Sequence, residues 1–258
     1  MDEGSAGVAF ETTSDAWFGG CLQLRQPLKG HRVGSDAALL AAAAPRAERI
    51  IDVGAGVGAV GLALLRRFES AEADLVEIDA DLARLAAENA IANGLASRGR
   101  IIVADVTLAP SRRAAKLEDG LADLVVTNPP FFATLTVRAS PQEKRARAHT
   151  FTGEGATLAG WLKGALALLA PGGRFVMIHR PDALAEILQN FEGRLGAVAI
   201  LPVHPRADAP AHRVLIAGVK GARGPLSLRS ALVLHDEKGA FTPKADALHR
   251  GEATIDWG

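Results

Sequence analysis

The chain has 258 residues, with 29 Lys and Arg against 29 Asp and Glu, so its formal net charge is zero. Hydrophobic residues make up 48% of the chain and charged residues 22%, which supplies a buried core and excludes a disordered chain. Zero net charge argues against a wholly basic coat for nucleic acid, although it leaves room for a local basic patch. The one cysteine, Cys21, excludes an intrachain disulfide.

The sequence carries no sign of a membrane segment. Its longest apolar run, residues 37–44, is far too short to span a bilayer, and residues 1–15 lack an apolar signal core. We therefore expect a soluble, cytoplasmic protein with no membrane partner.

A short helix is predicted to begin at Ser35 or Asp36, either of which can act as its N-cap, and to end at Pro45. Beyond it, strands are expected at 49–53, 73–78, 100–104, 122–127 and 174–178, and helices at 58–68, 80–92 and 157–169. Short strands with helices between them indicate a parallel sheet with right-handed crossovers. Two last strands, 198–203 and 213–219, have no helix of useful length between them, which favours an antiparallel hairpin.

This pattern predicts an α/β fold, a doubly wound Rossmann-like sheet with helices on both faces and a cofactor cleft at the carboxyl ends of its strands. Residues 1–45 are interpreted as an N-terminal extension with a capping helix. Residues 46–258 are interpreted as a single compact domain.

A glycine-rich loop follows the first strand of this sheet and opens a helix. Glycines let the backbone approach a ligand closely, and a helix N-terminus offers unpaired N–H groups to an anion. Gly56, Gly58 and Gly61 satisfy the spacing of the dinucleotide fingerprint. Asp52, however, suits a ligand that carries an ammonium group, and S-adenosylmethionine has an amino group, a sulfonium and no phosphate. The candidate cofactor-binding residues here are Asp52, Gly54, Ala55, Gly56 and Gly58, and the alternative is a tight turn without a ligand.

Acidic residues also end the next two strands. Glu77 lies about 20 residues beyond the glycines, where a carboxylate is positioned for ribose hydroxyls, and Ile78 can lie on an adenine face. Asp79 is expected to cap the following helix. Asp105, with Val106 beside it, can accept a hydrogen bond from the adenine amino group. The alternatives are an exposed strand end for Glu77 and a turn or cap for Asp105.

The fourth strand is followed by Asn128, Pro129, Pro130 and Phe131. Two prolines stiffen the backbone and remove two N–H groups, so the carbonyls of this loop are free to accept hydrogen bonds. The Asn128 side chain and the Pro129 carbonyl can take both hydrogens of a planar NH2 group, which orients the nitrogen for attack on a methyl sulfonium. Phe131 can stack on the ring that carries the amine.

Such a transfer depends on positioning more than on acid or base catalysis. The sequence accordingly shows no Ser/His/Asp constellation and no His/Cys cluster with metal-ligand spacing, so no metal is expected. We interpret these four residues as the catalytic loop, with Asn128 also close to the cofactor. The alternative is a strand-terminating turn with a core phenylalanine.

Together these motifs resemble the class I S-adenosylmethionine-dependent methyltransferases that act on planar exocyclic nitrogens. Flanking segments resemble more narrowly the bacterial tRNA adenine-N6 methyltransferases that modify the base beside the anticodon of valine tRNA. These segments are residues 26–36 (QPLKGHRVGSD), 209–214 (APAHRV) and 236–243 (DEKGAFTP). The resemblance covers nearly the whole chain and implies a seven-stranded sheet with the last strand antiparallel. Members often have Tyr where this chain has Phe131, which retains the capacity to stack.

The resemblance implies methyl transfer to the 6-amino group of an adenine in tRNA, with RNA as the partner. A basic segment after the proline loop can bind RNA phosphates, although an ordinary solvated loop would account for its charges equally well. Its basic residues are Arg138, Lys144, Arg145 and Arg147. Arg32, Ser35 and Asp36 can close over the methionine end of the cofactor, with helix capping as the alternative for the last two.

Other functions remain open at this level. The same chemistry fits a protein glutamine-amide methyltransferase or a methyltransferase of another RNA, although only about fifty residues precede the glycine loop. A nicotinamide-dependent Rossmann oxidoreductase fits the glycine spacing but not Asp52. A non-catalytic RNA-binding module would not need an intact proline loop. The oligomeric state and the modified nucleotide are not indicated by the sequence.

Overall fold

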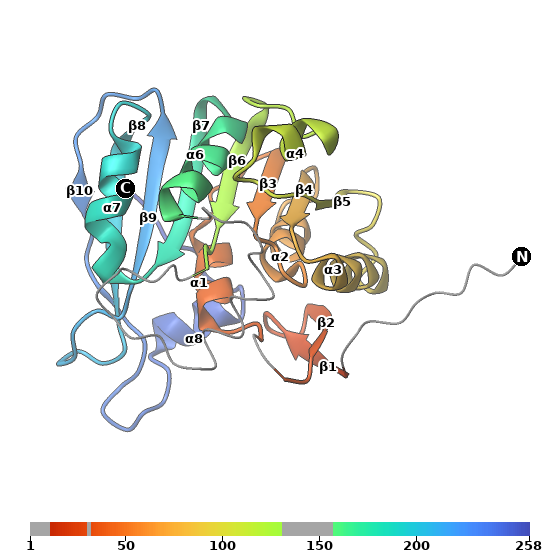
Figure 1. Ribbon diagram of the computed structural model, residues 1–258. Coiled ribbons are helices and arrows are strands. Elements are labelled where there is room, and N and C mark those ends of the chain that lie inside the picture. Colours follow the sequence, from red (N-terminus) through yellow and green to blue (C-terminus); the bar gives the residue numbers. More distant parts are fainter. Residues whose placement is uncertain (1–10, 30–31, 131–156) are drawn as a thin grey trace, which may run out of the picture.

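The structure is a computed structural model that describes residues 11–29, 32–130 and 157–258 (Figure 1). Phe131 and the basic residues Arg138, Lys144, Arg145 and Arg147 lie outside the described residues, so their roles stay predictions.

Helices and strands alternate through most of the described chain. It begins with β1 (Thr12–Trp17), β2 (Leu22–Pro27) and α1 (Ser35–Ala43). The central part contains β3 (Arg49–Val53), α2 (Ala59–Arg67), β4 (Glu72–Glu77), α3 (Ala80–Ala92), β5 (Gly99–Val103), α4 (Ala109–Ala114) and β6 (Ala122–Thr127). The last part contains α6 (Leu158–Leu168), β7 (Leu169–His179), η1 (Pro181–Ala183), α7 (Leu184–Phe191), β8 (Leu195–His204), β9 (Arg213–Lys220), β10 (Ser227–Leu228), β11 (Leu232–Val233) and α8 (Pro243–His249).

Within the described residues the central sheet has nine strands, in the order β10-β8-β9-β7-β6-β3-β4-β5, with β11 also paired to β8. Strands β3 to β7 pair in parallel, whereas β9 lies between β7 and β8 and is antiparallel to both. Strands β10 and β11 have only two residues each. Without these two, the sheet is the expected seven-stranded one, and its last strand along the chain is antiparallel. The hairpin predicted for the last two long strands is confirmed.

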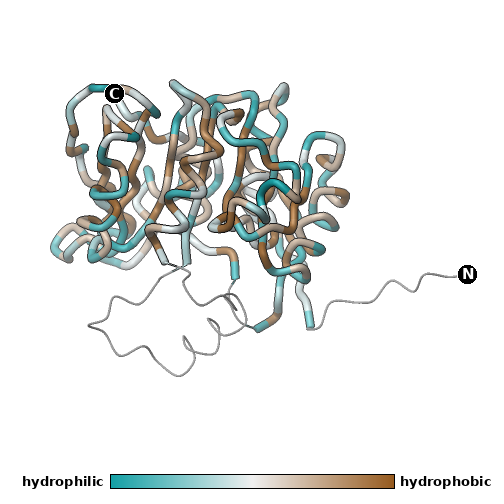
Figure 2. Tube along the Cα trace, turned by 45° about the horizontal axis from the view of Figure 1, so that its top comes forward, coloured by the Kyte–Doolittle hydropathy of each residue, from teal (hydrophilic) through white to brown (hydrophobic). Residues whose placement is uncertain are grey.

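The strands send alternate side chains to two separate cores, as the period of two in a strand requires. Ile50 and Leu75 belong to the core under α1 and α2, whereas their neighbours Ile51 and Val76 belong to the core under α6 and α7. Figure 2 shows the apolar stretches running along these strands and helices. Helices therefore cover both faces of the sheet, as expected.

Helix α1 is small and apolar on nearly every side, and residues 38–43 are at most 1% exposed. A helix that is hydrophobic all round belongs in a core. Its last carbonyls are satisfied by the C-terminal segment, since Ile255 N donates to Ala42 O (2.9 Å) and Trp257 Nε1 donates to Ala43 O (2.8 Å). The helix that the sequence assigned to an N-terminal extension is thus packed into the main domain.

Several local expectations hold and one is wrong. Strands β3 and β6 and helix α3 have the predicted bounds. The N-cap of α1 is Gly34 rather than Ser35 or Asp36, and it makes no side-chain capping bond. Asp36 instead pairs with Arg213, a contact between residues 177 positions apart that no local pattern predicts.

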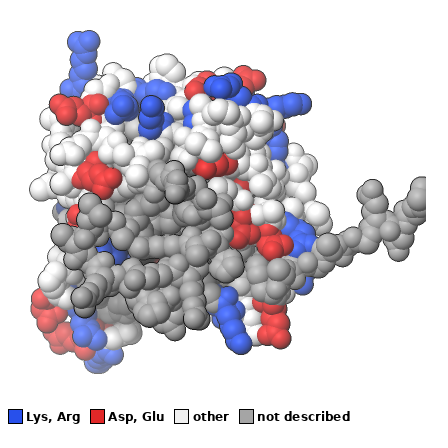
Figure 3. Space-filling view, viewed as in Figure 1, with Lys and Arg blue, Asp and Glu red and all other residues white. Residues whose placement is uncertain are grey.

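Several elements were missed by the sequence reasoning. They are the β1–β2 hairpin, helices α4, α7 and α8, the short η1 turn and the two-residue strands β10 and β11. The hairpin has polar residues on its solvated side, and α4, α7 and α8 have six to eight residues, too few for a clear apolar period. On the face shown in Figure 3, basic and acidic side chains intermix over the described surface, in keeping with the zero net charge.

Candidate active site

The carboxyl ends of the parallel strands meet at one edge of the sheet, at the bottom of Figure 1 beside α1. The register brings them level, because Val53 of β3 pairs with Val76 of β4 and with Thr127 of β6. A cavity of about 380 Å³ opens at this edge. The candidate residues in its wall are Asp52, Gly54, Ala55, Gly56 and Asn128, and across from the glycine loop it is lined by Arg32, Ser35, Asp36, His212 and Arg213.

Four N–H groups of the glycine loop are already used within the protein. Gly54 N and Ala55 N donate to Val76 O (2.8 and 3.0 Å), Gly56 N donates to Glu77 Oε2 (2.7 Å) and Gly58 N donates to Ala55 O (2.8 Å). A pyrophosphate-binding loop must instead offer these amides to the ligand. These four amides are therefore not available to a pyrophosphate, although the loop has the dinucleotide spacing.

Glycine is required at the start of this loop for two reasons. Gly54 has a φ of +76°, and a Cβ atom built on it would lie 2.8 Å from the ring of Trp161. Both the left-handed backbone and the close approach of α6 exclude a side chain here. Gly61 likewise allows α2 to pack on β4, since a Cβ there would lie 2.8 Å from Leu75.

Trp161 is a site residue that sequence reasoning missed. Its indole Nε1 donates to Thr127 Oγ1 (2.9 Å), and that hydroxyl donates to Val53 O (2.8 Å), which links α6 to the ends of β6 and β3. Beside the main cavity, a small recess is lined by Gly54, Val76, Ile78, Ala104, Asp105, Val106 and Trp161. The tryptophan is spaced with Leu158, Leu162 and Ala165 like an ordinary core residue, so the sequence offered no separate signal.

Asp52 is a buried carboxylate at the end of β3. It is 2% exposed, and its Oδ2 accepts a hydrogen bond from Gly61 N (2.8 Å). Burial raises the pKa of Asp52 to about 7, the Gly61 bond opposes that rise and the nearby Glu77 charge adds to it. A cation placed in the cavity would relieve this desolvation by stabilising the carboxylate form.

Glu77 is also buried, with 6% exposure, so the alternative of an exposed strand end is wrong. Its Oε2 accepts from Gly56 N (2.7 Å), and its Oε1 accepts from Ile78 N (2.8 Å) and Asp79 N (3.0 Å). Burial raises the pKa of Glu77, the three backbone bonds lower it and the neighbouring Asp79 raises it again. The carboxylate thus fixes the shape of the loop, while Oε2, which accepts a single bond, keeps a lone pair for a further donor.

Two further acidic residues behave as turn residues in the structure. Asp79 caps α3, its Oδ1 accepting from Asp81 N (2.9 Å) and Leu82 N (3.1 Å), as predicted. Asp105 Oδ1 accepts from the Thr107 N–H (2.8 Å) and hydroxyl (2.6 Å), which is the turn role given as its alternative. Asp105 also lines the small recess, so the turn holds a carboxylate at the recess wall.

The proline loop begins at the wall of the cavity. Asn128 is half-buried there, Pro129 is buried and Pro130 is half-buried. The loop leaves β6 from Thr127, which is fully buried and held by its bonds to Val53 and Trp161. The backbone that leads into Asn128 is therefore fixed by the buried Thr127 before it.

The opposite wall is built from segments far apart in the sequence. Asp36 Oδ2 accepts from Arg213 Nε (2.8 Å), which joins α1 to the start of β9. Ser35 Oγ lies 2.9 Å from His249 Nε2, which joins α1 to α8. Arg32, Ser35 and Asp36 are thus at the cavity, and Ser35 and Asp36 hold the wall together rather than cap the helix.

Neither a metal centre nor a spanning helix is found in the parts of the chain that the structure describes. No group of three or more His, Cys, Asp or Glu side chains there is arranged to hold a metal ion. None of the described helices is long and apolar enough to cross a bilayer.

The sheet order and this arrangement of strand-end acidic residues define a Rossmann-like methyltransferase. The chain belongs to the family described as the methyltransferase small domain, whose model matches residues 31–199. It is an S-adenosylmethionine-dependent methyltransferase, so the expected enzyme class and cofactor are confirmed. The oxidoreductase and non-catalytic alternatives are thereby set aside.

Relatives agree with the resemblance drawn from the sequence. The tRNA1(Val) (adenine(37)-N6)-methyltransferase of Musicola paradisiaca is 32% identical over 227 residues, which cover 84% of this chain and 85% of that protein. The enzyme of the same name from Serratia proteamaculans is 32% identical over 191 residues, covering 72% and 70%. A crystal structure of a predicted O-methyltransferase from Agrobacterium tumefaciens has a TM-score of 0.71 at 33% identity, covering 85% of this chain and 98% of that one.

Proposed function

We propose that this enzyme transfers a methyl group from S-adenosylmethionine to the 6-amino group of an adenine in tRNA. The relatives named for this reaction match most of the chain. The observation that carries the proposal is the position of Asn128, at the cavity wall directly after the rigid end of β6. The name of the structural neighbour points to an oxygen acceptor instead, so the acceptor atom has to be argued from the site.

Acidic side chains and the small recess are proposed to hold the cofactor. Asp52 faces the cavity from the end of β3 and suits the amino group, while Glu77 at the end of β4 suits the ribose hydroxyls. The recess beside Trp161 suits the adenine ring, with Ile78 and Val106 as apolar walls and Asp105 for its amino group. Gly54, Ala55, Gly56 and Gly58 provide the backbone along which the cofactor lies. When bound, S-adenosylmethionine supplies an electrophilic methyl group on a sulfonium.

The proline loop is proposed to select a nitrogen acceptor. The Asn128 side-chain oxygen and the Pro129 carbonyl together accept two hydrogens, which matches an NH2 group and not a hydroxyl. An amine held by both hydrogens keeps its lone pair directed at the methyl carbon. As the new N–C bond forms and the C–S bond breaks, the nitrogen releases one proton to solvent. Pro130 stiffens this loop, and Phe131 is proposed to stack on the acceptor base.

The partner is proposed to be tRNA, in keeping with the names of the relatives. Arg138, Lys144, Arg145 and Arg147 are proposed to bind its phosphates, and the location is proposed to be the cytoplasm. We also propose that residues 46–258 form the catalytic domain, onto which α1 of the N-terminal extension, residues 1–45, packs.

The test is methyl transfer from labelled S-adenosylmethionine to unmodified tRNA, followed by digestion and nucleoside analysis. We expect the label in N6-methyladenosine. Label in a ribose methyl ether would favour an oxygen acceptor, and label in a protein glutamine amide would favour the protein methyltransferase alternative. Either result would overturn the proposed acceptor while leaving the enzyme class intact.

A further inference from the structure

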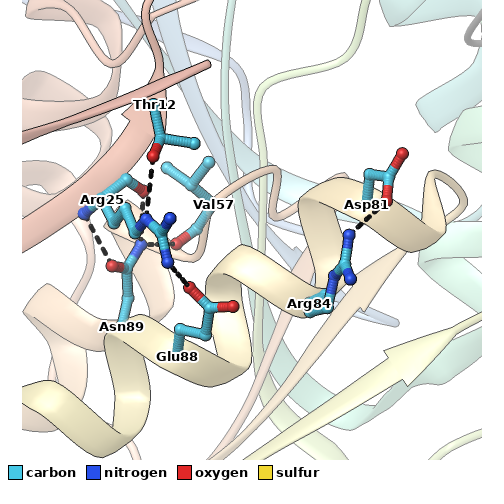
Figure 4. Close-up of polar contacts among 7 residues, drawn as sticks. All are labelled: Thr12, Arg25, Val57, Asp81, Arg84, Glu88 and Asn89. Carbon is cyan, nitrogen blue, oxygen red and sulfur yellow. Dashed lines mark hydrogen bonds and ion pairs between the residues drawn. The ribbon is translucent and has the colours of Figure 1, made fainter. Parts of the chain in front are cut away.

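Two asparagines one turn apart, Asn89 in α3 and Asn93 at its C-cap, bind the backbone of the β1–β2 hairpin. Asn89 Oδ1 accepts from Arg25 N (2.7 Å), and Asn89 Nδ2 donates to Arg25 O (2.9 Å). Asn93 makes the same two bonds with Gln23, at 2.9 and 2.8 Å. Since residues 23 and 25 are two apart on β2, each carboxamide takes the place of a peptide group in a neighbouring strand. Figure 4 shows Asn89 between Arg25 and the glycine loop.

Asn89 makes a third bond that Asn93 does not make. Its Nδ2 also donates to Val57 O (2.9 Å), within the glycine loop, whereas the third bond of Asn93 goes to Asn89 O (2.8 Å) in its own helix. Asn89 is 1% exposed, so its carboxamide is shielded from water. One carboxamide therefore joins β2, α3 and the loop proposed to hold the cofactor.

The Val57 carbonyl belongs to a peptide group that can rotate unless hydrogen bonds fix its orientation. Gly56 and Gly58, on either side of Val57, have φ values of +56° and +86°. Glycines permit many backbone conformations, so the peptide plane between Val57 and Gly58 has little local resistance to rotation. Its two ends are fixed by hydrogen bonds, the carbonyl by Asn89 Nδ2 and the Gly58 N–H by Ala55 O (2.8 Å).

We propose that Asn89 is a positioning residue for S-adenosylmethionine, which holds the glycine loop in its binding conformation and couples it to the β1–β2 hairpin. The proposal rests on the placement of the cofactor along Asp52 to Gly58. It assigns Asn89 no contact with the cofactor or with the reacting atoms.

Asn89→Asp and Asn93→Asp form a matched pair for the test. Each keeps the oxygen that accepts from a β2 amide and loses the donor to a β2 carbonyl. Each also loses one further bond, to Val57 O in the first variant and to Asn89 O in the second. Weakened hairpin docking is therefore common to both, and loss of the loop contact is confined to Asn89→Asp.

Calorimetric titration with S-adenosylmethionine, well below both melting temperatures, is the first readout. A lost buried hydrogen bond predicts a Kd about tenfold higher for Asn89→Asp. We expect a Kd within about twofold of wild type for Asn93→Asp and an unchanged kcat at saturating cofactor for both. Hydrogen exchange should accelerate at residues 54–58 in Asn89→Asp alone.

Equal Kd values for the two variants, or for Asn89→Asp and wild type, would overturn the positioning role. If Asn89→Asp does not fold, Asn89→Ser and Asn93→Ser carry the same comparison without burying a charge. Asp52→Asn and Glu77→Gln distinguish a failure of this proposal from a failure of the proposed cofactor site on which it rests. If those two variants also bind the cofactor normally, the placement along the loop is wrong and not merely the role of Asn89.

Discussion

The two walls of the cavity are built in different ways. The glycine-loop wall comes from neighbouring segments of the chain, since the loop after β3 and the acidic end of β4 are joined by the hydrogen bond from Gly56 N to Glu77 Oε2. The opposite wall joins α1 to β9 and α8 through the Asp36–Arg213 and Ser35–His249 contacts. The first wall is held by buried groups that other side chains could not replace, and the second by half-buried polar pairs. Substitutions in the first wall should therefore lower activity or stability more than substitutions in the second.

The largest effect on activity is expected at Asn128, where the substrate amine is proposed to meet the methyl donor. Asn128→Ala removes one of two proposed acceptors for the substrate amine and should lower kcat by about 100-fold or more, as loss of a preorganised hydrogen-bonding group does elsewhere. The Kd for S-adenosylmethionine should stay within about threefold of wild type by calorimetry. Near-normal turnover at saturating cofactor would contradict the assigned role of the proline loop.

Gly54→Ala tests the contact between the glycine loop and α6. It combines a strained backbone with a collision against the Trp161 ring, so it should lower the free energy of unfolding by about 3 kcal/mol. Gly94→Ala is the control, since Gly94 has a similar φ of +69° but open space around its Cβ position. That variant should lose only about 1 kcal/mol in the same urea titration. Equal losses would mean that the Trp161 contact contributes nothing.

Asp52→Asn should weaken the binding of S-adenosylmethionine and raise the stability of the fold above neutral pH. The pKa of Asp52 is raised from 3.8 to about 7, so between these values the folded chain holds a proton that the unfolded chain has lost. Stability contributed by this group therefore falls as pH rises from about 4 to about 7 and stays low above that. The variant should melt at a higher temperature than wild type at pH 8 and at nearly the same temperature at pH 4.

The same Asp52→Asn protein should bind S-adenosylmethionine about tenfold more weakly at pH 7.5, because it lacks the carboxylate proposed for the amino group. Thermal melts with and without cofactor measure both effects. An unchanged melting temperature at pH 8 together with unchanged affinity would contradict the role given to Asp52.

The smallest effect is expected on the opposite wall. Asp36→Asn breaks a half-buried ion pair and should lower the free energy of unfolding by about 1 kcal/mol. Asp74→Asn, which breaks the more exposed pair with Arg100, is the control and should lower it by less. A loss as large as that of Gly54→Ala would show that the two walls do not differ in the way described.

The positions of Asp52, Glu77 and Asn128 could be predicted from the sequence, whereas the contacts of the opposite wall could not, and the reason lies in where the contacts come from. Asp52 and Glu77 lie at the ends of β3 and β4 and Asn128 directly follows β6, so an alternating β/α pattern is enough to bring them to one edge. Trp161 was missed because its contact with Gly54 joins residues more than a hundred positions apart. The Asp36–Arg213 pair and the bond from Asn89 to Val57 likewise depend on tertiary packing that no local motif carries.

Asn128 and Pro129 are proposed to hold a planar amino group of adenine in RNA. The most direct test compares two synthetic valine tRNAs, one with adenine at position 37 and one with purine there, which lacks the 6-amino group. We expect methyl transfer at that position of the first tRNA and none there in the second. Equal transfer at that position in both would contradict this role of Asn128 and Pro129, because the methyl group would then be going to an atom other than the 6-amino nitrogen.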